Sequence, residues 1–299
     1  MIIIDTLLIG LSSGAIYSLM ALALVLVWRS TRVINFAQAG QAILSTYLGY
    51  EIMNRTHSYW ISVPFAVFAG ALIAAMVDAF LMRPLAKRSH KGSVSEIAPV
   101  IATLGLLGLI RSLTGLIWGN GYMQYTSPTS QLGYTINGHV IPFSPQNLVI
   151  VIGALIVMAT FAVIFKYTNL GLALRASSFQ PEISRLAGVR VDRIRTIGWA
   201  FAGAAGAVAG ALVTPTTYLS PNSLDLLLVS GFVAAVIGGL DSLIGAVLGG
   251  LILGVGFAFI LQYIGASVTF SSAFIILILV LFIRPRGILG QTGGGRRDA

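Results

Sequence analysis

One stretch near the start of the chain decides the fold class: residues 6–28 read TLLIGLSSGAIYSLMALALVLVW, with no charged side chain. A helix needs about 20 apolar residues to cross the hydrocarbon core of a bilayer. The stretch is too long for the apolar region of a cleaved signal peptide, and no basic residue precedes it. We therefore expect it to form a first transmembrane helix.

The composition of the whole chain agrees with this. The 299 residues are 57% hydrophobic and only 9% charged, and the mean hydropathy is +0.91. Soluble domains carry roughly 25% charged residues, so this chain could not cover a water-facing surface. A soluble enzyme, a disordered chain and a free-standing nucleic-acid binder are excluded. The absence of cysteine excludes a disulfide framework and thiolate catalysis.

Further apolar segments predict an all-α polytopic membrane protein with eight to nine transmembrane helices in a single transmembrane domain over 1–299. The seventh segment is short and ends at Gly238 and Gly239, so we expect a short or broken helix there. The predicted spans are 6–28, 34–53, 61–82, 97–118, 147–166, 194–214, 226–240, 243–264 and 267–283.

The basic residues predict the orientation. Of the 18 Lys and Arg residues, all except Arg55 and Arg111 fall in alternate loops, and the 119–146 loop has none. By the positive-inside rule the N-terminus is outside and the C-terminus inside, with 119–146 extracytoplasmic and 167–193 cytoplasmic. The four Trp residues lie near predicted span ends, as in an aromatic belt. An odd number of spans before the second half is compatible with an inverted repeat, although small residues in spans one and six are equally explained by helix packing.

Span two is the most polar of the predicted spans. At ~100° per residue its polar side chains fall within about 140° of one face; they are Asn35, Gln38, Gln41, Ser45 and Thr46. Uncharged amides in a membrane either line a wet cavity or bond across helices. Two interpretations stay open, a stripe lining a solute pathway and interhelical hydrogen bonding.

Three other segments predict local structure. After span five, Pro181 suits the first position of a short helix, Glu182 its positive end and Gly188 its stop. Such a helix would dock a soluble partner or lie on anionic lipid. The run from Val236 to Ala246 carries small residues that either pack helices or let them move. In the outer loop, Asn-Gly within 133–141 predicts a small external β-hairpin.

Charged and catalytic residue types are scarce within the spans. Asp78 lies a turn from an inner end, where we expect it to snorkel, and Arg111 lies deeper and would pair with an acid or a carbonyl. No chain of buried acids suggests a proton relay. The three His residues lie in loops, which makes a metal site improbable, and no GxxxxGK[ST] nucleotide motif occurs.

Five motifs in order along the chain resemble the permeases of bacterial branched-chain amino acid ABC importers, of the LivH type. Single motifs are short, and their shared order makes the resemblance specific. It runs nearly end to end. The motifs are Gly10-Leu11 with Gly14 to Leu19, Asn35-Phe36-Ala37 with Gly40, the Gly171 to Val189 segment with Arg175-Ala176, Gly238-Gly239-Leu240, and Arg284 to Gly290.

The resemblance implies a transport subunit without enzymatic activity or cofactor of its own, in the bacterial plasma (inner) membrane. Such permeases pair with a second, LivM-like permease, two cytoplasmic ATPases that bind the ATP, and an extracytoplasmic solute-binding protein; membrane lipid surrounds them, and nucleic acid is not a partner. Relatives import leucine, isoleucine and valine, and others carry urea, short amides or aromatic acids.

Applied to this chain, the resemblance assigns three groups of residues. The residues assigned to the solute pathway are Tyr17, Asn35, Gln38, Gln41 and Ser45. Those assigned to the gate or hinge are Gly238, Gly239 and Asp241. Coupling to the ATPase takes Gly171, Arg175, Glu182, Arg185 and Gly188. The chain departs from the family's common residues at Gln38, Gln180 and Ser184, in the pathway and the coupling segment. A stand-alone secondary transporter is the competing class, and nothing resembles the site of a membrane enzyme.

Overall fold

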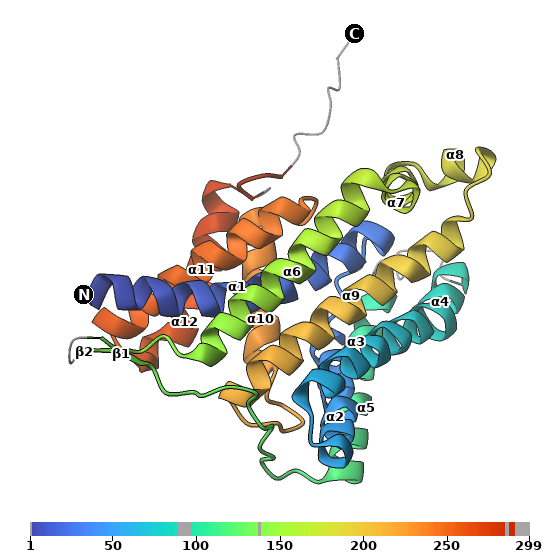
Figure 1. Ribbon diagram of the computed structural model, residues 1–299. Helices are drawn as coiled ribbons and strands as arrows, with labels where there is room; N and C mark the ends of the chain where they lie inside the picture. Colours follow the sequence, from blue (N-terminus) through green and yellow to red (C-terminus); the bar gives the residue numbers. More distant parts are fainter. Residues whose placement is uncertain (1, 89–96, 137–138, 285–286, 291–299) are drawn as a thin grey trace.

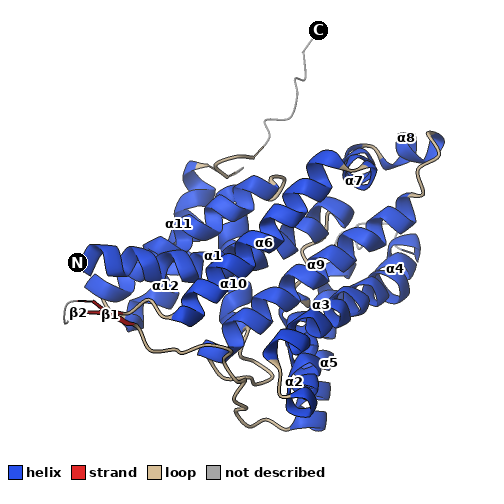
Figure 2. Ribbon diagram, in the orientation of Figure 1, coloured by secondary structure: helices blue, strands red, loops and turns tan. Residues whose placement is uncertain are grey.

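The computed structural model describes residues 2–88, 97–136, 139–284 and 287–290 as a bundle of helices with one small hairpin (Figures 1 and 2). The elements in chain order are α1 (Ile2–Thr31), α2 (Gln38–Thr56), α3 (Tyr59–Met76), the π-helix η1 (Val77–Met82), α4 (Arg83–Arg88), α5 (Ala98–Trp118), β1 (Tyr134–Ile136), β2 (His139–Ile141), α6 (Pro145–Tyr167), α7 (Asn169–Phe179), α8 (Pro181–Leu186), α9 (Val191–Val213), the 3-10 turn η2 (Thr214–Thr216), α10 (Asp225–Gly238), α11 (Leu243–Tyr263) and α12 (Ala266–Ile283).

A helix occupies each of the nine predicted segments. Within the described residues, seven are long and apolar enough to cross a membrane: α1, α3 with its continuation to Ala86, α5, α6, α9 with η2, α11 and α12. The other two are α2, which is polar, and α10, which has 14 residues. At 1.5 Å per residue α10 is roughly 21 Å long, shorter than the ~30 Å hydrocarbon core.

Helix α1 lies at the centre of the bundle and contacts α6, α9, α10 and α11. Figure 1 shows α6 and α9 running side by side, and the two helices are in contact. Glycines set the closest approach: a Cβ on Gly250 would lie 2.6 Å from the Ser18 Cα, and one on Gly70 would lie 2.7 Å from the Ala207 Cβ. Small residues thus let α1 pack on α11 and α3 pack on α9.

The predicted hairpin is confirmed. Strands β1 and β2 pair antiparallel with Tyr134 opposite Ile141, and the Asn-Gly turn itself lies outside the described residues. The hairpin lies near the start of α1, whereas α7 and α8 lie at the opposite end of α6 (Figure 1). Between α5 and β1, the Tyr125 hydroxyl lies 2.7 Å from the Ser62 hydroxyl. Burial raises the Tyr125 pKa, so the phenol stays neutral at physiological pH.

Three expectations are corrected. Helix α2 begins at Gln38, and Asn35 lies in the turn before it. Trp199 is fully buried in the core, so it is not part of an aromatic belt. Asp78 does not snorkel: its side chain is fully buried, 2.9 Å from the Arg195 Nε and 3.1 Å from the Arg83 Nε. Arg111 pairs with the acid Asp225, as one of the two alternatives predicted.

Candidate functional site

The polar stripe of span two is completely buried at the start of α2. Asn35, Gln38, Gln41, Ser45 and Thr46 are at most 1% exposed. The Asn35 Nδ2 donates to the Gln38 Oε1 at 3.1 Å and to the Gln41 Oε1 at 3.5 Å. The two hydroxyls turn back to their own helix, where each donates to the Ala42 carbonyl at 2.8 Å. In this conformation the stripe is an internal network of hydrogen bonds.

Helix α9 makes room for this network. The Gln38 Nε2 donates to the Ala202 carbonyl at 3.0 Å. A Cβ on Gly206 would collide with that same amide nitrogen, and one on Gly210 would lie 2.5 Å from the Thr46 hydroxyl. The glycines of α9 therefore receive the polar side chains of α2, which fits the interhelical interpretation.

Two atoms of the stripe remain unpartnered within the described structure, the Asn35 Oδ1 and the Gln41 Nε2. A buried polar atom without a hydrogen bond costs about 1–3 kcal/mol. These atoms would gain a partner in a conformation that admits water or a solute beside α2. The pathway assignment of Asn35, Gln38, Gln41 and Ser45 therefore stays a prediction for another state of the protein.

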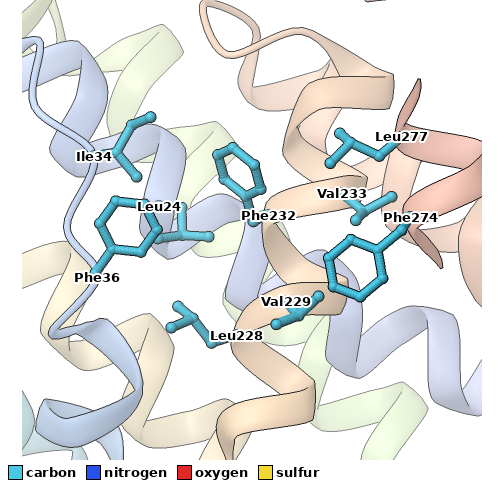
Figure 3. Close-up of a pocket in the computed structure, with 9 residues that line it drawn as sticks. All are labelled: Leu24, Ile34, Phe36, Leu228, Val229, Phe232, Val233, Phe274 and Leu277. Carbon is cyan, nitrogen blue, oxygen red and sulfur yellow. The ribbon is translucent and has the colours of Figure 1, made fainter. Parts of the chain in front are cut away.

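An apolar cavity of about 240 Å³ lies directly beside this stripe, between the turn before α2 and helix α10. Figure 3 shows Phe36 and Phe232 on one side of it and Phe274 on the other. The two rings of Phe36 and Phe232 have centroids 6.4 Å apart. The lining is entirely hydrocarbon, from Leu24, Ile34, Phe36, Leu228, Val229, Phe232, Val233, Phe274 and Leu277. Such a surface holds an aliphatic group and offers nothing to a charged one.

A second cavity, of about 560 Å³, has a mixed lining and contains Tyr17. It lies between α1, α6, the end of α9 with η2, α10 and the segment before it, α11, and the start of α12. Ser12 donates to the Asn147 Oδ1 at 3.2 Å across this space. The hydroxyl and amide groups that line it are Ser12, Ser13, Tyr17, Asn147, Thr216, Thr217, Ser223, Ser230 and Thr269. Of these, the sequence predicted only Tyr17; the Ser12-Ser13 pair inside an apolar span is the signal that could have indicated others.

Helix α10 is held at both ends by ion pairs. At its start Asp225 pairs with Arg111 of α5. Beyond its end, Asp241 pairs with Arg32 at 2.5 Å and accepts from the Trp28 Nε1 at 3.3 Å. Both pairs are partly exposed, so each contributes about 0–1 kcal/mol. They join α10 to α5 and to the segment between α1 and α2.

The two predicted hinge glycines lie at the end of α10. Gly239 has a φ of 101°, a backbone conformation that favours glycine. Gly238 packs so closely on Gly245 that a Cβ would overlap the Gly245 carbonyl. The Ile288 and Leu289 amides donate to the carbonyls of Ile237 and Gly238 at 2.8 and 3.1 Å. The C-terminal motif thus caps α10, and the gating role of Gly238, Gly239 and Asp241 stays a prediction.

The predicted coupling residues lie on α7, α8 and the turn after them. Pro181 opens α8, and Gly188 follows it with a φ of 82°, both as predicted. Gly171 lies in the first turn of α7, where a Cβ would lie 2.5 Å from the Phe165 carbonyl. Arg175 and Glu182 are exposed. Arg185, also exposed, lies 3.4 Å from Asp192. Their role in coupling is taken up below.

No group of three or more His, Asp or Glu residues that could hold a metal ion occurs in the described part of the chain. Of the described carboxylates only Asp78 is buried.

These features define a multi-pass integral membrane protein with one apolar cavity and one cavity of mixed lining between its helices. Residues 6–283 match the model of a family described as "Branched-chain amino acid transport system / permease component". The chain belongs to this family of ABC-transporter permeases, and it is a multi-pass protein of the inner membrane.

Several curated proteins are similar over almost their whole length. The probable branched-chain amino acid transport permease protein LivH of Methanocaldococcus jannaschii is 29% identical, over 94% of this chain and 91% of that protein. The high-affinity branched-chain amino acid permeases LivH of Escherichia coli K12 and BraD of Pseudomonas aeruginosa are each 28% identical, over 94% of both chains. Among solved structures, PsaBC from Streptococcus pneumoniae in complex with Fab has a TM-score of 0.50 at 13% identity, covering 93% of this chain and 91% of that one. That likeness concerns the fold alone.

Proposed function

We propose that this chain is the membrane-spanning subunit of an ATP-driven importer for branched-chain amino acids or a similar small solute. The family match over residues 6–283 carries the proposal. The working complex would contain a second permease, two cytoplasmic ATPases that hydrolyse ATP, and an extracytoplasmic solute-binding protein. Urea, short amides and aromatic acids remain alternative solutes.

The N-terminus is outside and the C-terminus inside. This orientation is supported by the way the basic segments meet at one end of the bundle. Arg29, after span one, lies over the ring of Phe165 at the end of α6, 5.9 Å from its centroid. Arg83, after span three, donates to the Asp192 carbonyl at 2.5 Å. Basic residues of three loops thus lie on the end that also holds α7 and α8, as the positive-inside rule requires. The short α10, the seventh of the nine segments, would cross with help from the unwound residues beside it, which gives nine crossings in all.

The two halves of the chain form an inverted repeat in this proposal. In this repeat α1 corresponds to α9, α2 to α10, α3 to α11 and α5 to α12. When both helices of a main packing pair are replaced by their counterparts, the result is another pair of helices that are in contact. The pair α1–α11 becomes α9–α3, α2–α3 becomes α10–α11, and α2–α5 becomes α10–α12; all six contacts are present. Both long pairs are also closed by glycines, Gly14 with Gly254 and Gly70 with Gly203. Transporters use such repeats to alternate access around a central site.

The segment of α7 and α8 is the element that transmits the conformational change of the ATPase subunits on ATP binding to the membrane helices. Ile183 and Leu186 of α8 are 58% and 89% exposed, a surface that a soluble subunit would cover. The charged residues Arg175, Glu182 and Arg185 lie near this surface. Gly171 lies in the first turn of α7, and Gly188 forms the turn after α8. The 11-residue α7 and the turn at Gly188 connect this surface directly to α6 and α9.

Reconstitution tests the proposed function. The chain should co-purify with ATPase subunits, and uptake in liposomes should require ATP and those subunits. Uptake by this chain alone, driven by an ion gradient, would contradict the proposal and support a secondary transporter. The pairing of Asp78, the one buried carboxylate among the described residues, with two arginines gives such a transporter no unpaired acid for ion coupling.

The apolar cavity is the place where an aliphatic side chain would pass. Phe232→Ala removes the whole ring that Figure 3 places against Phe36. In a hydrophobic site, even one methylene changes discrimination by about 10–200-fold. We expect the ratio of leucine to alanine uptake, measured on the reconstituted complex, to fall about tenfold.

Phe68→Ala is the matched control, because Phe68 is 66% exposed and lies outside this cavity. It should leave the uptake ratio unchanged. Equal ratios in both variants would assign the cavity to packing against another subunit rather than to solute recognition.

A further inference from the structure

A third cavity, of about 520 Å³, lies where α8 turns into α9, beside the start of α4. Its charged lining comes from Arg83, Arg185, Asp192 and two further arginines, with the backbone of Gly188 and the residues after it completing the wall. The two further arginines are Arg190 and Arg193. The solute pathway and the hinge proposed above do not use this cavity; the coupling segment shares Arg185 and Gly188 with it, whereas Arg83, Arg190 and Arg193 have no role assigned so far.

The cavity is strongly cationic. Four guanidinium groups and one carboxylate line it, which gives a net charge of +3. Next to the cavity lining, the opposite charges of Asp78 and Arg195 compensate each other. Asp192 lies 3.4 Å from Arg185, while Arg190 and Arg193 make no side-chain hydrogen bond or ion pair to any residue that the structure describes. A cluster of guanidinium groups with too few carboxylates to neutralise it favours an anionic ligand.

One arginine is fixed in place before any ligand arrives. The Arg83 guanidinium binds the Asp78 carboxylate, the Thr196 hydroxyl and, at 2.5 Å, the Asp192 carbonyl. Its side chain is 26% exposed. A guanidinium that is already ordered loses less entropy when it binds, and its planar donors suit a phosphate.

The position of the cavity identifies the kind of anion. Arg83 lies near the end of the apolar stretch Tyr59–Ala86, and Arg190 directly precedes the apolar stretch Val191–Thr216. Phe80, three residues before Arg83 and within the apolar stretch, is 78% exposed, as expected for a side chain that contacts lipid. A phosphate held here would sit at the boundary between hydrocarbon and water, at the level of lipid headgroups. Basic pockets between transmembrane helices at this level bind anionic headgroups.

We propose that the cavity lined by Arg83, Arg185, Arg190 and Arg193 binds the phosphate group of an anionic membrane lipid. The bound lipid contacts both α4 and the start of α9. It thereby stabilises the connection between the α8 segment and the helix bundle. The site requires only that the protein lies in a membrane, so it stands or falls separately from the proposed importer activity.

The test measures retention of phosphatidylglycerol by the purified protein in phosphatidylcholine nanodiscs, using native mass spectrometry. The variants are Arg190→Gln, Arg193→Gln and the double variant. An arginine near an anionic surface contributes about fivefold in affinity, so the double variant should retain the lipid about 25-fold more weakly. Lys166→Gln is the matched control: it removes one positive charge from the end of α6, which does not line the cavity.

Three outcomes would overturn the proposal. An equal loss in Lys166→Gln would mean that only the general positive charge matters. Displacement of the lipid by millimolar inorganic phosphate would assign the cavity to a soluble anion. Unchanged lipid retention in the double variant, with weakened binding of the ATPase subunits, would assign the arginines to an acidic surface of that partner.

Discussion

Replacing Gly254 by alanine is expected to remove most folded protein from the membrane, although it adds a single methyl group. Gly254 lies on α11 where that helix crosses α1. A Cβ at this position would overlap the backbone of Gly14 and lie 2.7 Å from the Gly10 carbonyl. Both partners are backbone atoms, so no side chain can turn aside to admit the methyl group. The two central helices would have to separate.

The expected cost is at the upper end for overpacking, about 3 kcal/mol or more. It should appear as loss of the monodisperse peak after detergent extraction and as a lower midpoint of thermal inactivation. Gly256→Ala on the same helix is the control, because nothing lies within 4 Å of a Cβ there. Alanine is the better helix former by about 1 kcal/mol, so this variant should be neutral or slightly more stable. Equal behaviour of the two variants would mean that α1 and α11 do not meet as described.

The contrast between Gly254 and Gly256 shows which features of helix packing can be predicted from the sequence. Small residues in spans one and six and in the run from Val236 to Ala246 indicate close helix packing, and α1 does pack closely on α9, α10 and α11. Which glycine faces α1 depends on the rotation of α11 about its axis. A helix that is apolar on all sides carries no periodic signal to fix that rotation. The sequence therefore identifies the helices that approach closely, and only the structure identifies the residues in contact.

The helices themselves were largely predictable, because an apolar run in a membrane has few alternatives to a helix. The start of α2 was not. Asn35 continues the polar period of the helix in sequence, yet Ala37 is the N-cap and Asn35 lies in the turn before it. The Asn35 amide still reaches the side chains of Gln38 and Gln41, so the predicted cluster forms even though its helical geometry was wrong.

The candidate site was predictable only in part, since its walls converge from distant segments. The partner of Gln38 is a carbonyl 164 residues away on α9. The apolar cavity joins residues of α1, α10 and α12 with the turn before α2. No local period in the sequence brings these groups together. For the same reason the sequence shows the four arginines of the cationic cavity only as members of two separate basic segments, one after span three and one after span five.

Asp78 is the second position where a small change should have a large effect. Its carboxylate is fully buried and holds Arg83 and Arg195, whose side chains are 26% and 17% exposed. The Thr196 hydroxyl also donates to it at 2.5 Å. The sequence indicated a snorkelling carboxylate because its partners follow 5 and 117 residues later. Asp78→Asn keeps the shape of the side chain and leaves two partly buried guanidinium groups without a counter-charge.

Removing one partner of a buried ion pair costs about 3–5 kcal/mol, and the residual exposure of the arginines places Asp78→Asn near the lower figure. We expect the thermal inactivation midpoint to fall by roughly 6 °C or more. Glu51→Gln is the control, because Glu51 is 43% exposed and lies 3.5 Å from Arg55; an exposed pair contributes about 0–1 kcal/mol. Adding Arg195→Gln to Asp78→Asn should recover part of the loss, since it removes one of the two unpaired charges. If the double variant is instead less stable than Asp78→Asn alone, Arg195 stabilises the inner end of α9 through contacts other than this ion pair.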